Sequence, residues 1–367
     1  MKEALPREMY VDEATWRRER DAVLFGEWFC IGRVGALGLA VPSRVVAVDV
    51  AGESILVTSD EEGVLHAAYN VCRHRGSQIL PATSANPPSA CQASALRCPY
   101  HSWTYGLDGR LLKAPHAEFD GPEGASAFAL HPVGVETWGG FVFVHLSPER
   151  ARPLAESVAH AATTLANYGL ADLVVGASFT YDVAANYKVV LENYNECYHC
   201  GPVHPELCRL VPSFAGGGDD LDWGSGIPHR DGAWTFTTTG TTTRAPLPGL
   251  DADERTRHKG DLVYPNLMIS ASADHVAAFV LLPHAPNRTT VECSLLFTET
   301  AVEAADFDPS DAGELWDLVN QQDWAVCESV QRGMTSRSYQ HGWFAPMEDD
   351  SLDIRRWLLP RLQPAKG

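Results

Sequence analysis

The chain has 367 residues, of which 45% are hydrophobic and 20% are charged, and its formal net charge is −19. These values predict a folded protein of about two domains. They exclude general binding to nucleic acid or to anionic lipid, because both need a basic surface. No apolar run is long enough to span a membrane, and the N-terminus has no apolar core of signal-peptide type, so we expect a cytoplasmic protein without membrane association.

The chain begins with mixed charged and apolar residues that predict helices followed by a strand. Short β-rich runs come next, for example at 45–50 and 140–144, and the turn residues at 106–109 separate two extended runs. We therefore expect an N-terminal helical segment at 1–40, which packs on a later domain. A small all-β domain is expected at 41–150.

The all-β segment contains two closely spaced pairs of potential metal ligands, Cys72 with His74 and Cys98 with His101. Two Cys and two His on tight turns suit a zinc ion. They equally suit a two-iron two-sulfur cluster, in which the Cys bind one iron and the His bind the other. The spacing alone leaves both possibilities open. The chain has nine cysteines, an odd number that does not resemble a secreted disulfide framework.

The residues around these pairs are Cys-Arg-His-Arg-Gly from Cys72 and Cys-Pro-Tyr-His-Ser-Trp from Cys98, and they resemble the Rieske domain of ring-hydroxylating and related oxygenases. The resemblance implies a [2Fe–2S] cluster on the two pairs, with the second ring nitrogens of His74 and His101 as an exit for electrons. The spacer between the pairs is longer than is usual in the family. We place the extra residues at 81–95, around Cys91, in a surface loop that costs little closure entropy.

Basic residues surround the cluster ligands in the sequence of this otherwise acidic chain. We hypothesise that they form a local docking patch for an acidic electron donor. The five residues are Arg73, Arg75, Arg97, Arg110 and Lys113.

A second constellation combines carboxylate and imidazole groups further along the chain. In a continuous helix Asn193, Glu196 and His199 step by three and share a face, where Asn193 and Glu196 are candidate catalytic residues. A Gly-Pro pair then ends the helix, so that His204 folds back toward His199 from another direction. Two imidazoles that meet at an angle leave open coordination positions, which an iron that activates dioxygen requires.

This block resembles the iron-binding motif of the same oxygenases, in which an acidic residue precedes the first His by three and the second His follows by five. The resemblance implies that His199 and His204 bind iron and that Glu196 connects the iron to a Rieske histidine of a neighbouring subunit. A Glu at this position is typical of the carnitine, choline and glycine betaine monooxygenase branch. We interpret Cys197 and Cys200 as packing residues, and the rival interpretation is a redox dithiol or half of a zinc site.

A facial iron site needs a carboxylate as its third ligand, and the predicted helix at 310–334 supplies Asp323. At 100° per residue, five apolar residues fall within about 40° of Asp323, which therefore lies in the middle of an apolar stripe. A buried carboxylate needs a cation, which iron supplies, and the alternative is an Asp paired with an Arg. The surrounding segment also resembles the family's third-ligand segment. The stripe contains Trp316, Val319, Cys327, Val330 and Met334, and the charges outside it are Glu314, Asp317 and Glu328.

The resemblance covers most of the chain and implies an α+β protein. A helix-grip catalytic domain, in which helices cover an antiparallel sheet, is expected to follow the Rieske domain at 151–367. The resemblance implies Fe(II), O2 and electrons that come from NAD(P)H through a separate flavin reductase or ferredoxin. In the family the two centres of one chain are too far apart for electron transfer, so a homotrimer is implied, with Glu196 on the route between subunits.

The substrate implied by the resemblance is a small organic molecule. The preferred hypothesis is monooxygenation of a quaternary-ammonium or other N-alkyl compound, which ends in N-demethylation. The alternative is an aromatic-ring hydroxylating (di)oxygenase. A reading from another class is an electron-transfer or zinc-binding protein without oxygenase activity.

Overall fold

The computed structural model of the chain divides into two compact units. The continuous unit is Leu24–Glu156, and the discontinuous unit combines Met1–Val23 with Ser157–Gly367. The N-terminal segment that belongs with the later residues thus ends well before residue 40, because β2 (Phe29–Arg33) is a strand in the sheet of the continuous unit. The structure describes residues 1–81, 90–119, 123–218 and 221–363.

The continuous unit is built on antiparallel sheets, as predicted. Its larger sheet has seven strands in the order β2-β11-β10-β5-β4-β3-β6, and a smaller one has the order β7-β8-β9. Valine-rich β3 and β4 join through a two-residue turn at Ala51 and Gly52, which both have positive φ, as a tight hairpin requires. The remaining strands are β3 (Arg44–Val50), β4 (Glu53–Ser59), β5 (Leu65–Tyr69), β6 (Cys91–Gln92), β7 (Leu96–Arg97), β8 (Thr104–Tyr105), β9 (Leu111–Lys113), β10 (Pro132–Trp138) and β11 (Phe141–His145).

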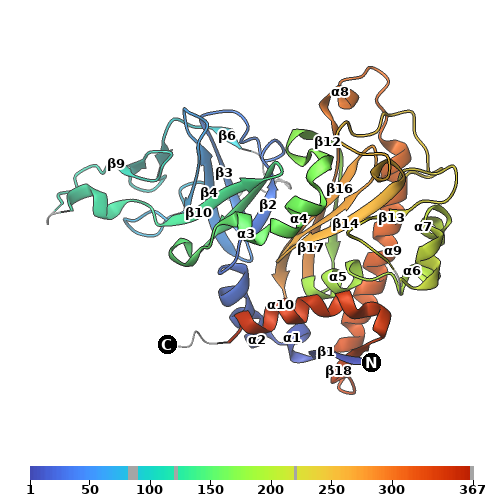
Figure 1. Ribbon diagram of the computed structural model, residues 1–367. Coiled ribbons are helices and arrows are strands. Elements are labelled where there is room, and N and C mark those ends of the chain that lie inside the picture. The colour runs from blue at the N-terminus through green and yellow to red at the C-terminus, as the bar shows by residue number, and fades with distance from the viewer. Residues whose placement is uncertain (82–89, 120–122, 219–220, 364–367) are drawn as a thin grey trace. The chain divides into compact units, whose positions relative to one another are not determined.

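The discontinuous unit is a sheet covered by helices, which confirms the predicted α+β class (Figure 1). Its six antiparallel strands lie in the order β12-β17-β16-β15-β14-β13, and helix α9 packs against β12 and α5. The strands are β12 (Leu173–Val183), β13 (Ile227–Pro228), β14 (Arg257–Val263), β15 (Leu267–Ala271), β16 (Val276–Ala285) and β17 (Arg288–Thr298). The helices along the chain are α1 (Glu8–Val11), α2 (Glu13–Glu19), α3 (Leu154–Ser157), α4 (Ala159–Thr164), α5 (Tyr187–Tyr194), α6 (Cys200–Val203), α7 (Pro205–Leu210), α8 (Glu299–Val302), α9 (Ser310–Met334) and α10 (Asp353–Arg361).

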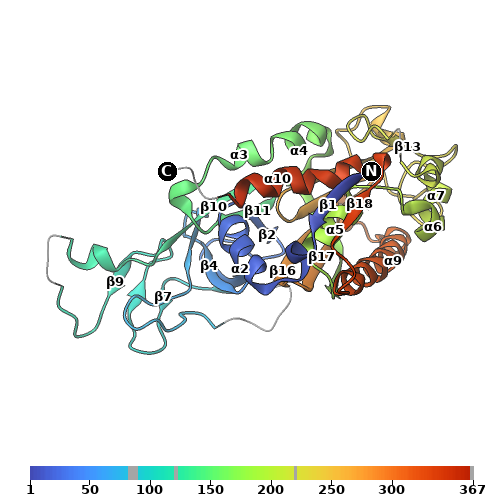
Figure 2. The same cartoon turned by 90° about the horizontal axis from the view of Figure 1, so that it is seen from below.

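The N-terminal residues are integrated into the discontinuous unit. Strand β1 (Lys2–Pro6) pairs with β18 (His341–Phe344), and the two lie side by side in Figures 1 and 2. The carboxylate of Glu19 on α2 accepts hydrogen bonds from Lys188 Nζ at 2.8 and 2.9 Å, and both side chains are fully buried. Removal of one partner from a buried ion pair strongly destabilises the fold, because the other charge stays buried without compensation. The pair therefore holds α2 against α5.

Helix α9 has the predicted bounds, but its charged side chains differ from the prediction. Val330, which was assigned to the apolar stripe, is 40% exposed because it lines a cavity instead of packing in the core. Asp317 and Glu328, which were predicted to face solvent, have partners because β12 and the loop after it run along this side of the helix. Asp317 accepts a hydrogen bond from Tyr181 Oη at 2.7 Å, and Glu328 accepts one from the backbone N–H of Ala184 at 3.1 Å.

Most of the predicted insertion at 81–95 cannot be compared with the structure, since 82–89 lie outside the described residues. Cys91 is exposed on β6, where it pairs with Val45 of β3.

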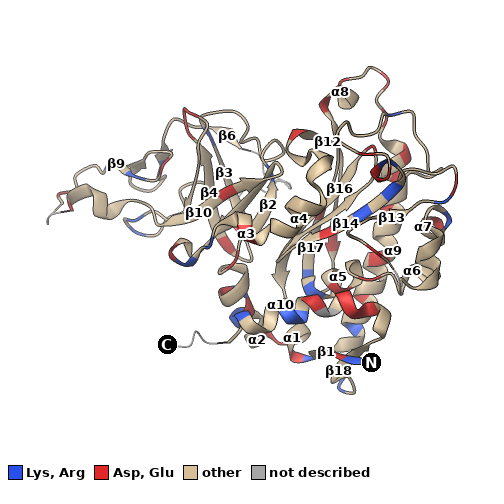
Figure 3. Cartoon of the chain, viewed as in Figure 1, with Lys and Arg blue, Asp and Glu red and all other residues tan. Residues whose placement is uncertain are grey.

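Lys and Arg residues are scattered singly among Asp and Glu in the view of Figure 3. Among the described helices, none combines the length and the apolar character needed to cross a membrane.

Candidate metal centres

Two tight turns of the continuous unit carry the four predicted cluster ligands. Each turn closes on a backbone hydrogen bond that the N–H of its Cys donates, at 2.9 Å for Cys72 and 2.8 Å for Cys98. The two thiols belong to the hydrophobic core and are each 2% exposed, whereas His74 and His101 are exposed. The turns therefore bury the sulfur atoms and leave the imidazole edges facing outward.

Aromatic side chains hold these ligands in place. The ring of Trp103 stacks on His74 at a centroid distance of 5.1 Å, and the rings of His74 and His101 are 4.7 Å apart. The hydroxyl of buried Tyr105 lies 3.3 Å from Cys72 Sγ. Burial raises the pKa of Tyr105, and the interaction with Cys72 adds to this effect, so the phenol keeps its proton and can donate it to the sulfur.

The arrangement of the four side chains distinguishes between zinc and a cluster. Burial opposes ionisation of Cys98, but its pKa is lowered because the N–H of Tyr100 and the side chain of Cys72 bond to the thiolate. Within the described part of the chain, one group brings three ligand atoms within 4.8 Å of one another, and the cluster ligands do not form such a group. A tetrahedral zinc would require that convergence. Paired thiols and paired imidazoles instead fit a two-iron cluster with Cys on one iron and His on the other.

The second constellation does not lie on one continuous helix, so this part of the prediction is wrong. Helix α5 ends at Tyr194, before Glu196 and His199. The cause is the carboxylate of Glu196, which accepts the backbone N–H groups of Tyr198 and His199 and so starts a new turn. The Gly-Pro pair lies inside the short helix α6, and the chain changes direction at His204, between α6 and α7.

Three side chains converge although the helix is broken. The Nε2 atoms of His199 and His204 lie 3.3 and 2.9 Å from Asp323 Oδ1, and the ligand atoms of all three residues lie within 4.8 Å of one another. The two rings meet at 78°, and His204 is 1% exposed. The amide of Asn193 lies 3.4 Å from His199 Nε2. The arrangement thus presents two nitrogens and one carboxylate to a single point.

Hydrogen bonds at the far side of each ring fix which nitrogen faces that point. Nδ1 of His199 lies 2.6 Å from Glu196 Oε1, and Nδ1 of His204 lies 2.7 Å from Gln322 Oε1. Because both partners are acceptors, each Nδ1 carries a proton, and each Nε2 atom faces Asp323 at the point where a metal would bind. Sequence reasoning did not identify Gln322, since its amide has no recognisable motif spacing and its only signal is its position next to Asp323.

The electrostatics of this group favour a bound cation. Burial lowers the pKa of His199, but the negative charges of Asp323 and Glu196 outweigh this effect and raise the pKa to about 10. Burial also opposes ionisation of Asp323, yet hydrogen bonds from the two imidazoles lower its pKa. In the described residues the ion-pair partners of Asp323 are the two imidazoles and not an arginine, which was the rival interpretation. The group therefore holds a positive charge beside Asp323, and a bound Fe(II) that displaced the Nε2 protons would supply it. Two imidazole nitrogens and a carboxylate at one point fit the facial set of non-haem Fe(II).

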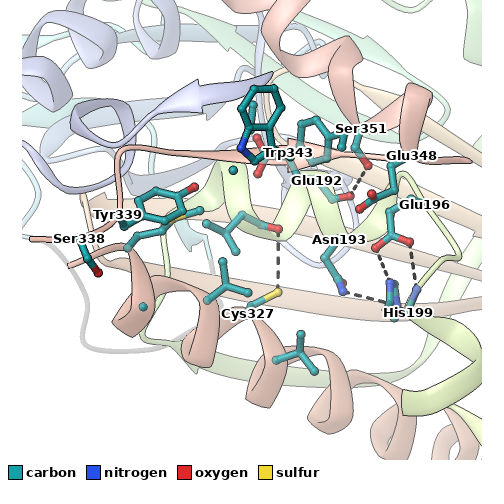
Figure 4. Close-up of a pocket in the computed structure, with 18 residues that line it drawn as sticks. Glu192, Asn193, Glu196, His199, Cys327, Ser338, Tyr339, Trp343, Glu348 and Ser351 are labelled. Atoms are coloured by element: carbon teal, nitrogen blue, oxygen red, sulfur yellow. Dashed lines mark hydrogen bonds and ion pairs between the residues drawn. The ribbon is translucent and has the colours of Figure 1, made fainter. Parts of the chain in front are cut away.

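A cavity of about 570 Å³ opens beside His199 and Glu196 (Figure 4). Glu192 and Glu348 also line it, and the indole of Trp343 on β18 is 54% exposed at its edge. Burial raises the pKa of Glu192 to about 8, although the Tyr10 hydroxyl that donates to its carboxylate works against this effect. Sequence reasoning did not select Glu192, and the only available signal was its position four residues before Glu196.

The two cysteines around His199 are joined in the structure. A disulfide links Cys197 and Cys200, whose Cα atoms are 4.9 Å apart, and both side chains are buried. The two residues are buried, as packing residues would be, but their union in a disulfide matches the rival interpretation as a redox dithiol. The turn that Glu196 starts brings the two Cβ atoms together, which a separation of three residues in sequence does not reveal by itself.

Two protein families match separate parts of the chain. The family described as the ring hydroxylating alpha subunit (catalytic domain) matches residues 170–363, which is more than half of the chain. The family described as the Rieske [2Fe-2S] domain matches residues 27–123. Each match contains all the ligands that were predicted for its metal centre.

Individual relatives match along nearly the full length. The oxygenase subunit of glycine betaine monooxygenase from Chromohalobacter salexigens is 31% identical, over 92% of this chain and 81% of the relative. The oxygenase subunit of carnitine monooxygenase from Escherichia coli is 29% identical, over 92% of this chain and 85% of that protein. The crystal structure of the quaternary ammonium Rieske monooxygenase CntA with its substrate gamma-butyrobetaine has a TM-score of 0.74 and 26% identity, and covers 98% of this chain and 96% of that one.

These matches exclude the alternative hypothesis that the chain is an electron-transfer or zinc-binding protein without oxygenase activity. The donor sets described above fit the cofactors of the matched families, a Rieske [2Fe–2S] cluster and a mononuclear non-haem iron. The chain belongs to the Rieske-type ring-hydroxylating oxygenase alpha subunits and is an oxygenase that uses O2 and reductase-derived electrons.

Proposed function

We propose that this oxygenase is a monooxygenase for a quaternary-ammonium or other N-alkyl substrate. One atom of O2 enters an N-methyl C–H bond as a hydroxyl group, and two electrons and two protons reduce the other atom to water. The N-hydroxymethyl product then releases formaldehyde, so that the net result is N-demethylation. The observation that carries the oxygenase chemistry is the convergence of His199, His204 and Asp323. The substrate class is inferred from the relatives, which are named for glycine betaine and carnitine.

The geometry supports the following assignment of the metal ligands. We assign the cluster to Cys72, His74, Cys98 and His101, and thus the Rieske domain to the continuous unit. We assign iron to His199, His204 and Asp323, and thus the catalytic domain to the discontinuous unit. The bound iron supplies the activation of O2. The chain orients both imidazoles through their Nδ1–H groups and provides a single carboxylate, which leaves coordination positions open.

Glu196 is proposed to connect the two centres. Its carboxylate bonds to His199 Nδ1 on one side and lines the open cavity on the other. We propose that an exposed imidazole edge of His74 or His101 from a neighbouring subunit docks there, in the homotrimer that the family resemblance implies. Asn193 contacts the other ring nitrogen of His199, Nε2, at 3.4 Å and is proposed to help position the ring. We keep the cytoplasm as the predicted location.

A ferredoxin or flavin reductase is proposed to deliver electrons from NAD(P)H to the cluster. Of the five basic residues near the cluster, all but Arg73 are exposed, and Arg75 stacks over the ring of Tyr100. Arg73 donates to the backbone carbonyl of Ala129 at 2.7 Å, so it is the poorer test of docking. Changing Arg75 and Arg97 to Glu should slow reduction of the cluster in a salt-dependent way, without loss of iron. Unchanged reduction kinetics with the native donor would refute the docking patch.

The experiment for the proposed function is product analysis with ¹⁸O₂, the protein with both metal centres filled and a surrogate reductase. The panel contains glycine betaine, carnitine, gamma-butyrobetaine and a set of aromatic acids. We expect formaldehyde and a demethylated amine in equal amounts, or one ¹⁸O atom in an amine. Two ¹⁸O atoms on an aromatic ring would overturn the proposed substrate class and establish the aromatic alternative.

A further inference from the structure

The two iron-binding histidines are supported in different ways. A carboxylate oxygen of Glu196 accepts the Nδ1–H of His199 at 2.6 Å, whereas an amide oxygen of Gln322 accepts the Nδ1–H of His204 at 2.7 Å. One imidazole is thus backed by a negative charge and the other by a neutral group. A carboxylate makes a histidine a more basic ligand than an amide does, so the two rings are not equivalent.

A second carboxylate fixes the orientation of the amide. Gln322 Nε2 donates to Glu206 Oε2 at 3.3 Å, and Glu206 lies in the first turn of α7. A carboxylate oxygen of Glu206 accepts this hydrogen bond, so the NH₂ group of Gln322 faces Glu206 and its amide oxygen faces His204.

The position of Gln322 on α9 links the orientation of His204 to the position of Asp323. It directly precedes Asp323 on α9, so the helix supplies the carboxylate ligand and also the group that orients His204. His204 is 1% exposed, and water therefore cannot take the place of the amide oxygen. Loss of this acceptor would leave a buried N–H without a partner and the ring free to rotate away from Asp323.

We propose that Gln322, oriented by Glu206, is a positioning residue that holds His204 in the iron-binding tautomer while adding no charge. This inference rests on the proposed iron site. It assigns His199, which Glu196 backs, as the more basic imidazole on the side where electrons arrive. It assigns His204 as the neutral anchor of the metal.

The test measures Fe(II) affinity on protein that keeps its cluster, by competition with a ferrous chelator. Gln322→Leu removes the acceptor and should weaken Fe(II) binding by about 10- to 100-fold. Gln321→Leu is the matched control, because this neighbouring amide is exposed, bonds to Asp317 and does not face His204. Gln322→Glu restores an acceptor and should recover Fe(II) binding. It should also change the EPR spectrum of the ferrous nitrosyl complex, since His204 is then backed by a charge.

A second variant avoids any doubt about folding. Glu206→Gln changes a partly exposed side chain and should give a smaller loss of Fe(II) affinity, because the amide of Gln322 loses its fixed orientation. The visible spectrum of the cluster reports the integrity of each variant. Equal Fe(II) affinity for Gln322→Leu and Gln321→Leu would overturn the inference. A wild-type protein that holds no iron beyond its cluster would instead overturn the proposed function, and the inference with it.

Discussion

The two metal regions differ in how the chain supplies and encloses their ligands. In the continuous unit, ligands two or three residues apart lie on turns, with buried thiols and exposed imidazoles. In the discontinuous unit, His204 and Asp323 are 119 residues apart and the imidazoles are enclosed. Both ring Nδ1 atoms there are bonded to acceptors of the same chain. The proposed cluster site thus keeps histidine edges available for electron exchange, whereas the proposed iron site uses both Nδ1 atoms to fix the orientation of its rings.

Removal of the third iron ligand should have the largest effect on this comparison. Asp323→Ala should abolish oxygenation and retention of the mononuclear iron, because two imidazoles without a carboxylate bind Fe(II) weakly, while the cluster remains. Iron analysis together with the visible spectrum of the cluster measures both centres. Glu314→Ala, an exposed change on the same helix, is the control. Loss of the cluster as well would mean that the two regions are not independent.

The next effect concerns the link between the regions. Glu196→Gln can still accept the N–H groups of the turn and the Nδ1–H of His199, so we expect iron and cluster to be retained. Turnover should fall by about 10- to 100-fold, because the charge that backs His199 is lost. Glu348→Gln is the matched control, since it lines the same cavity and bonds to the backbone of Ala345 instead. Equal turnover of the two variants would contradict a special role for Glu196.

A third prediction concerns the buried charge of the discontinuous unit. The pKa of Glu192 is raised from its usual value of 4.5 to about 8 in the folded protein. At pH values between these two, the folded state therefore binds more protons than the unfolded state does. Stability should therefore decrease as the pH rises from about 4.5 to 8, by on the order of a few kcal/mol. Glu192→Gln should flatten this dependence, as measured by urea unfolding at several pH values. Glu314→Gln serves as the exposed control, and an unchanged slope for Glu192→Gln would show that the carboxyl is not buried in its neutral form.

The smallest expected effect lies in the cluster region. Tyr105→Phe removes a hydroxyl 3.3 Å from Cys72 Sγ and keeps the buried ring. Hydrogen bonds to sulfur stabilise the reduced cluster. We expect a lower reduction potential, by the equivalent of about 1 kcal/mol for one hydrogen bond. Redox titration followed by EPR measures it, and an unchanged or higher potential would show that the hydroxyl does not donate to the sulfur.

The cluster turns were predictable from the sequence because each holds its ligands within a few residues. Helix α9 was predictable for a similar reason, since its apolar period and the acidic residues before it are local signals. The end of α5 was not, because the carboxylate of Glu196 competes with the helix for backbone N–H groups. The contact of Gln322 with His204, which lie 118 residues apart, depends on the folded path of the chain. Local patterns do not encode that path.

The pairing of β1 with β18 has a consequence for the order in which the chain folds. Lys2 on β1 is paired in the sheet with Phe344 on β18, and Glu19 forms its ion pair with Lys188. Residues 24–156 form a compact unit that includes no residue from later in the chain, so this unit can fold during translation. The oxygen-activating half cannot be completed until β18 at residues 341–344 has been synthesised. The nascent protein would therefore hold an electron-accepting module before it holds a site that activates oxygen.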